Sequence, residues 1–93
     1  MASIKQLKKE IEFLSAQVID DCIDLVQTFS GKEKEALEVI DTIISLHHST
    51  IDMLNHPDGK DNPKLVKAFY KQLRISYMDG INEAYKQLEE LVK

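Results

Sequence analysis

Apolar residues recur every three or four positions along most of this chain, which is the spacing of one face of an α-helix. In the first segment the apolar row begins at Ile4 and reaches Phe29, and Gly31 follows it as the residue type that commonly ends a helix. The middle segment begins near Glu33 and has one polar residue, His47, in its apolar row. We expect that row to be the buried seam of the middle helix: Leu37, Ile40, Ile44, His47, Ile51 and Leu54.

The clearest break in this periodicity lies between Pro57 and Pro63, where two prolines and Gly59 exclude a regular helix. Asn62 is suited to cap a third helix whose first residue is Pro63. Gly80 interrupts the apolar row of that third helix, which predicts a close approach by another backbone.

Short connections make consecutive helices antiparallel neighbours. The sequence therefore predicts an all-α fold, an antiparallel up-down-up three-helix bundle that forms one domain over residues 1–93. The predicted helices span about 4–30, 33–55 and 63–92.

The apolar face of the first helix is wider than one neighbouring helix covers, and the third helix also has a wide face. A surplus apolar face predicts association, most simply a homodimer or a complex with another helical protein. The interface candidates on the first helix are Phe13, Ile19, Ile23 and Val26.

If each hairpin folds about its connection, facing residues have numbers that add up to a constant, about 62 for the first pair of helices and about 119 for the second. This arithmetic brings Ser15 and Tyr70 towards His47. A hydrogen-bonded polar layer that fixes helix register is the favoured interpretation. The alternative is a nucleophile–base pair of Ser15 and His47, but we find no carboxylate placed to orient the histidine.

His48, Asp52 and His56 follow one another at intervals of four residues along the middle helix, a spacing suited to a pair of metal ligands. Eight residues of helix span about 12 Å, whereas a Zn–N bond is about 2 Å long, so both histidines cannot bind one ion. These three residues are candidates for a metal site only if another segment completes it, and we predict no cofactor.

The chain has 12 Lys and Arg against 16 Asp and Glu, a formal net charge of −4, which argues against extensive nucleic-acid binding. Lysines nevertheless gather in the first turns of the first and third helices, at one end of the predicted bundle. The alternative function is therefore a binding module for an anionic ligand or nucleic acid at that basic end. Its candidate residues are Lys5, Lys8, Lys9, Lys64, Lys67 and Lys71.

Cys22 is the only cysteine, so no intrachain disulfide forms and a reducing compartment is expected. No apolar run approaches the length of about 20 residues that a membrane span needs. We therefore expect a cytoplasmic protein without a membrane partner. No predicted loop holds a cluster of titratable residues of the kind that an active site needs, so we expect it not to be an enzyme.

The run from Ile4 to Ile11, with Phe13 and the Asp20-Asp21-Cys22 group after it, resembles the start of a family of short, uncharacterised all-helical bacterial proteins. The resemblance covers about the first quarter of the chain. It implies a small bacterial helical bundle, and it supplies no activity, cofactor or site residue.

Overall fold

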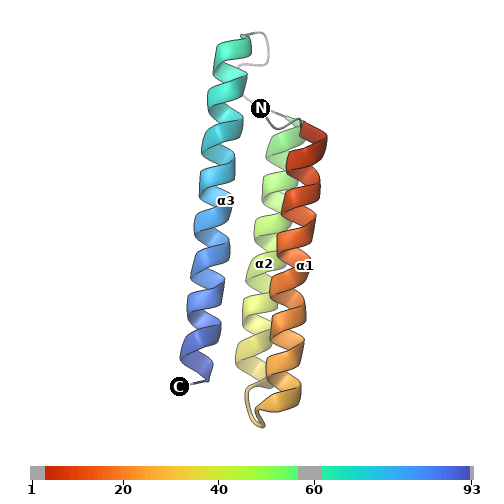
Figure 1. Cartoon of the computed structure of the whole chain (residues 1–93), viewed down its shortest axis with the longest axis vertical. Helices are drawn as coiled ribbons and strands as arrows, with labels where there is room; N and C mark the ends of the chain where they lie inside the picture. Colours follow the sequence, from red (N-terminus) through yellow and green to blue (C-terminus); the bar gives the residue numbers. More distant parts are fainter. Residues whose placement is uncertain (1–3, 57–61, 93) are drawn as a thin grey trace.

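A computed structural model describes residues 4–56 and 62–92 of this chain. It has three helices, α1 (Ile4–Thr28), α2 (Glu33–Asn55) and α3 (Pro63–Leu91). Helices α1 and α3 start at the same end of the molecule and α2 runs the opposite way, with all three nearly parallel to the long axis (Figure 1). The predicted all-α, up-down-up three-helix bundle is confirmed.

The helix ends follow from local chemistry. Helix α1 ends at Thr28, two residues before the predicted end, and Gly31 has the left-handed φ of 85° that glycine tolerates best. Helix α3 begins as predicted, because the side chain of Asn62 accepts hydrogen bonds from the backbone N–H groups of Lys64 and Leu65. The predicted loop falls mainly on residues 57–61, outside the described residues.

The core is a single apolar cluster to which all three helices contribute. Helix α1 presents a row from Leu7 to Leu25 and α3 a row from Leu73 to Leu88. The most completely buried large side chains are Tyr77, Ile11, Ile43, Leu54, Val18 and Cys22.

The buried seam predicted for α2 is wrong. The row that faces the core lies about one residue position round the helix from the predicted row. The side chains of Leu37 and Ile44 are 58% and 42% exposed, and only Leu54 of the predicted row is fully buried. The row that faces the core is instead Ala36, Val39, Ile43, Thr50 and Leu54. Helix α2 packs against both α1 and α3. The centre of its buried face therefore points between these two helices, where small residues fit.

The axial position of α3 also differs from the prediction. The contacting pairs Leu54–Tyr70 and Leu46–Gly80 have residue numbers that add up to 124 and 126, not 119. Helix α3 is therefore shifted by about six residues, or about 9 Å, along the bundle axis. It extends beyond the end of α2 (Figure 1). The neighbour of Gly80 is accordingly the side chain of Leu46, not another backbone.

Two carboxylates of α1, those of Glu10 and Asp21, form polar contacts with side chains of α3. Arg74 donates two hydrogen bonds to the carboxylate of Glu10, at 2.7 and 3.3 Å. Further along, burial of the Tyr85 hydroxyl and its hydrogen bond to the Asp21 carboxylate raise the pKa of Tyr85 to about 12. Both pairs bring together residues whose numbers differ by 64, which fits two helices running in the same direction.

Gly80 and Leu46 should be energetically coupled. A Cβ at position 80 would lie 2.5 Å from Cδ2 of Leu46, so Gly80→Ala gains helix propensity but displaces that side chain. In a Leu46→Ala background the substitution should stabilise the protein by about 1 kcal/mol. In the wild type the gain should be smaller or reversed. Urea unfolding of the four proteins tests this, and an equal effect of Gly80→Ala in both backgrounds would contradict the contact.

Tyr85 should make the protein less stable at alkaline pH. Its pKa is about 12 in the folded chain and about 10 in an unfolded one, so the unfolded chain loses the proton first. The free energy of unfolding should therefore fall between pH 10 and pH 12. Tyr85→Phe should make that decline shallower in urea titrations across this window. Parallel declines in the two proteins would show that Tyr85 does not contribute.

Candidate functional site

A groove runs between α1 and α2 and is hollowed at two places. The first pocket, of about 260 Å³, is lined by Glu12, Ser15, Ala16, Ile19, Ile43, Ile44, His47 and His48. The second, of about 330 Å³, is lined by Ile23, Val26, Gln27, Glu33, Leu37 and Ile40. Both pockets are lined by α1 and α2 alone, so together they form one surface, the α1–α2 groove.

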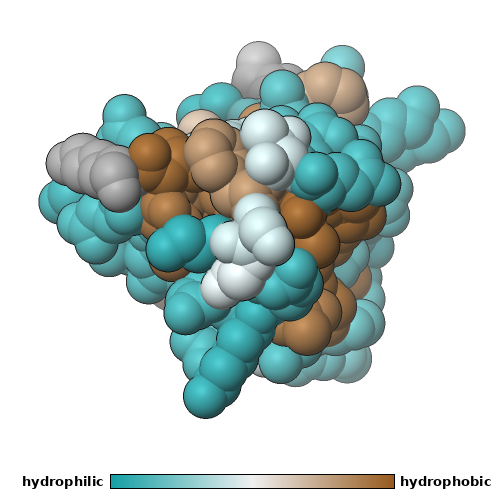
Figure 2. All heavy atoms as spheres, turned by 90° about the horizontal axis from the view of Figure 1, so that it is seen from below, coloured by the Kyte–Doolittle hydropathy of each residue, from teal (hydrophilic) through white to brown (hydrophobic). Residues whose placement is uncertain are grey.

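The floor of the α1–α2 groove is aliphatic and only partly covered. We call this set the groove floor: Ile19, Ile23, Val26, Leu37, Ile40 and Ile44. Ile23 is 45% exposed, and Ile19, Val26 and Ile40 pack partly against the core. Viewed from the end that holds the α1–α2 connection, apolar side chains reach the surface between hydrophilic ones (Figure 2). The groove floor is therefore a second apolar row beside the core row of each helix.

The groove opens on the flank of the bundle that α3 does not cover. Residues of α1 that contact α3, such as Glu10 and Asp21, lie on the opposite side of the α1 core row from Ile19 and Ile23. Helix α3 consequently stabilises the bundle without shielding the groove.

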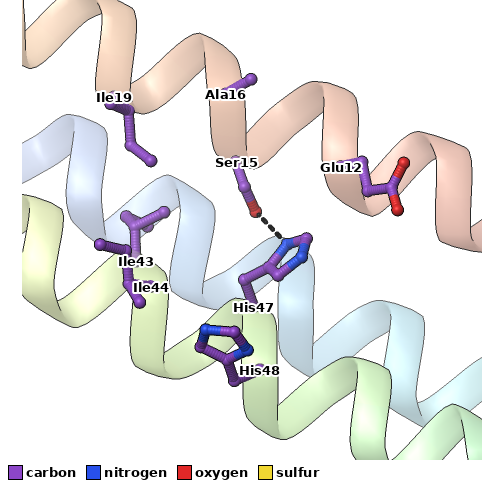
Figure 3. A pocket seen from close by; sticks show the side chains of 8 residues that line it. All are labelled: Glu12, Ser15, Ala16, Ile19, Ile43, Ile44, His47 and His48. Atoms are coloured by element: carbon purple, nitrogen blue, oxygen red, sulfur yellow. Dashed lines mark hydrogen bonds between the residues drawn. The ribbon is translucent and has the colours of Figure 1, made fainter.

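Ser15 of α1 and His47 of α2 point towards one another in the first pocket (Figure 3). The oxygen of Ser15 lies 3.1 Å from Nδ1 of His47 and 2.5 Å from the hydroxyl of Tyr77 on α3. Tyr77 in turn lies 2.8 Å from the carbonyl oxygen of Ile11. Four residues from three helices thus form one hydrogen-bonded chain.

The donor and acceptor of each hydrogen bond in this hydrogen-bonded chain can be assigned by elimination. The Ile11 carbonyl only accepts, so Tyr77 donates its single hydroxyl proton there. Ser15 must then donate to Tyr77, which leaves it only able to accept from His47. Neutral His47 therefore has its proton on Nδ1 and a free lone pair on Nε2. Burial, partly offset by the Ser15 hydrogen bond, raises the pKa of Tyr77 and keeps it a donor at neutral pH.

The hydrogen-bonded chain bears on two expectations from the sequence. Ser15 is a partner of His47 as predicted, but Tyr70 is not, because its hydroxyl lies 3.5 Å from the carbonyl of Leu54. The shift of α3 puts Tyr77 in its place. A catalytic histidine accepts a proton from its serine, whereas His47 donates to Ser15. The proton between Ser15 and His47, as assigned above, therefore runs opposite to that of a nucleophile and its base.

Three of the four interface candidates of the first helix, Ile19, Ile23 and Val26, lie on the groove floor. Phe13 does not line either pocket and is 67% exposed. At 100° per residue it lies about 80° round the helix from Ile23. The sequence argument missed the contribution of α2, because Leu37, Ile40 and Ile44 were assigned to the core.

The metal candidates are all exposed: His48 and Asp52 lie on α2, and His56 directly follows its last residue. Within residues 4–56 and 62–92, no group of three His, Cys, Asp or Glu side chains is placed to hold a metal ion. The ring of His48 instead meets that of His47 edge-on, with centroids 5.8 Å apart.

The lysines predicted to form a basic end belong to the same end of the bundle, but they do not converge. Lys8 donates to the side chain of Asn55 at 2.6 Å, and Lys71 lies at about the same level on α3. Lys64 and Lys67 lie on the part of α3 that reaches the start of α1 or projects beyond it (Figure 1). Lys5 and Lys9 are exposed on α1.

Cys22 is fully buried in the core. Burial, together with the neighbouring Asp21 carboxylate, raises the pKa of its thiol. A thiol that resists ionisation is a poor nucleophile and metal ligand. Cys22 is therefore a packing residue.

Comparison of this chain with models of protein families, with curated proteins and with solved structures found no match. The resemblance of its first quarter to uncharacterised bacterial helical proteins stays a prediction. Of the helices described, none is both long enough and apolar enough to cross a membrane.

The hydrogen-bonded chain should contribute measurably to stability. Tyr77→Phe leaves Ser15 without its acceptor in a buried position, which should lower the free energy of unfolding by about 1–3 kcal/mol. Tyr70→Phe is the matched control, because a hydroxyl 3.5 Å from its acceptor makes a marginal bond and should cost less than about 1 kcal/mol. Urea unfolding measures both, and equal costs would contradict the stabilising role of the hydrogen-bonded chain.

Proposed function

We propose that this protein is a non-enzymatic helical bundle that works by self-association, with two copies burying the α1–α2 groove against each other. The observation that supports the proposal most strongly is the groove floor, a row of six aliphatic side chains along two adjacent helices that the bundle's own core covers only in part. Contiguous exposed apolar surface of this kind is typical of protein interfaces.

The size of the groove face fits a dimer interface. Helix α1 has 25 residues and is about 37 Å long, and the bundle is about 19 Å wide. The face that α1 and α2 share therefore has an area of about 700 Å². Stable protein interfaces bury about 800 Å² on each partner. A second copy offers the same length and the same apolar row, so it matches the groove from end to end.

The surface and shape of one chain also favour a partner. Its accessible surface is 6473 Å², whereas a compact monomer of 10.7 kDa exposes about 5500 Å². Its radius of gyration is 15.2 Å, compared with about 12 Å for a compact domain of 93 residues. Covering the α1–α2 groove would remove a large part of this excess surface.

Helix α3 was also expected to take part in the interface, but its exposed apolar residues are scattered. Ile75 is 45% exposed and is flanked along its face by the exposed polar residues Lys71, Gln72 and Asp79. Leu65 lies near the start of α3, far from Ile75 along the helix. We therefore place the interface on α1 and α2 alone.

The buried, unpaired thiol of Cys22 fits a protein of the reducing cytoplasm. The direction of the Ser15–His47 hydrogen bond supports a structural role for the most buried polar pair of the groove. Both points favour a cytoplasmic binding protein over a secreted protein or a hydrolase.

Charged residues on the groove floor should separate the two copies. Leu37→Glu and Ile44→Glu keep good helix propensity but place a carboxylate in the interface, where its desolvation is unfavourable. Each variant should stay folded by circular dichroism and sediment as a monomer. Ile75→Glu is the matched control, with a similar side-chain exposure on α3, and it should leave the dimer unchanged.

Two outcomes would overturn this assignment. A wild-type chain that sediments as a monomer at every concentration would remove the proposed function. A dimer that persists in both groove variants and dissociates in Ile75→Glu would move the interface to α3.

A further inference from the structure

We infer that the self-association proposed above is switched by pH, because a charged imidazole of His47 in the first pocket favours separate chains over the dimer. This inference rests on the proposed function and adds its regulation. The switch depends on three features of His47: its level along the bundle, the hydrogen bond that holds its ring, and the side chains around it.

The first pocket lies close to the middle of the α1–α2 groove. Ser15 is one residue from the midpoint of α1, and His47 is three residues, or about 4.5 Å, from the midpoint of α2. A two-fold dimer that covers the groove along its whole length places the middle of one copy against the middle of the other, whichever way the helices run. The first pockets of the two copies therefore face each other, and both His47 side chains lie near the symmetry axis.

Protonation of His47 leaves its hydrogen bond to Ser15 in place. The Nδ1–H group donates to Ser15 in the neutral ring, as assigned above, and it can donate in the same way in the charged ring. Within residues 4–56 and 62–92, Nε2 of His47 takes part in no hydrogen bond, so the added proton is accepted there. The charge thus changes in the groove while the hydrogen-bonded chain that joins the three helices stays intact.

Three titratable groups lie near the His47 ring, one on each helix. Tyr77 of α3 reaches it through Ser15 and stays neutral, because burial raises the pKa of its hydroxyl. His48 of α2 meets the ring edge-on and gains charge of the same sign in acid. Glu12 of α1 is exposed, and its side chain extends away from the His47 ring (Figure 3). In the described part of the chain neither histidine has a carboxylate at ion-pair distance.

The remaining walls of the first pocket are aliphatic, formed by Ala16, Ile19, Ile43 and Ile44. A second copy that covers these walls removes water from Nε2 of His47, and loss of water disfavours the charged ring far more than the neutral one. The dimer therefore binds fewer protons than two separate chains, so a fall in pH shifts the equilibrium towards separate chains. Two charged rings near the symmetry axis also repel each other.

The net charge of the whole chain acts in the opposite direction. It is −4 at neutral pH and becomes less negative in acid, which weakens the general repulsion between two copies. A dimer that dissociates in acid thus indicates a local positive charge in the interface.

Sedimentation equilibrium of the full-length chain at pH 8, 7 and 6 tests the switch, with circular dichroism at each pH to show that the helices persist. The dissociation constant of the wild-type dimer should rise about tenfold between pH 8 and pH 6, the range in which histidine gains most of its charge. His47→Asn keeps an N–H donor near the position of Nδ1 but cannot gain a proton. Its dissociation constant should change by less than about threefold over the same range.

His56→Asn is the matched control. His56 follows the last residue of α2, about half a turn round the helix from His47, and lines neither pocket of the groove. This variant should show the same acid dissociation as the wild type.

A wild-type dimer whose dissociation constant is unchanged, or falls, between pH 8 and pH 6 would overturn the switch and leave self-association standing. Acid dissociation that persists in His47→Asn and disappears in His48→Asn would assign the charge to His48 and overturn the role of His47. A wild-type chain that sediments as a monomer at pH 8 at every concentration would remove the proposed function itself.

Discussion

Helix α2 has two adjacent apolar rows, and two neighbouring helices can bury only one of them completely. The core takes the row that points between α1 and α3, where Ala36 and Ile43 are fully buried. The other row, with Leu37, Ile40 and Ile44, is left at the surface beside matching aliphatic residues of α1. The α1–α2 groove follows directly from this arrangement.

The position of α3 decides which flank of the bundle stays open. The hydrogen bonds among Ser15, Tyr77 and His47 join all three helices at one level, and buried polar contacts of this kind select a register. Gly80 allows Leu46 to pack closely in the same register, and Arg74 meets Glu10 nearby. With α3 held on that side, the groove remains accessible along most of α1 and α2.

Much of the fold could be predicted from local sequence signals. The apolar period gave three helices, Asn62 and Pro63 marked the start of α3, and Gly31 marked the turn after α1, because each of these features acts on its own segment. The register of α3 could not be predicted in this way. It depends on contacts between residues far apart in the sequence, and a shift of about 9 Å replaced Tyr70 by Tyr77.

About half of the residues of the groove floor could be predicted from the sequence. Ile19, Ile23 and Val26 were recognised because α1 has more apolar residues than one neighbour needs. Leu37 and Ile44 were missed because a regular row of large aliphatic residues is also the pattern of a core seam, and the true core row contains the less conspicuous Ala36 and Thr50. The burial of a row depends on the position of both neighbouring helices, which periodicity alone does not define.

The central claim is that a second copy covers the α1–α2 groove, and the mass of the native chain in solution tests it most directly. Sedimentation equilibrium over concentrations from the low micromolar to several hundred micromolar should give a mass that rises towards twice 10.7 kDa and goes no higher, because a two-fold interface closes on itself. A mass of 10.7 kDa throughout that range would contradict the account.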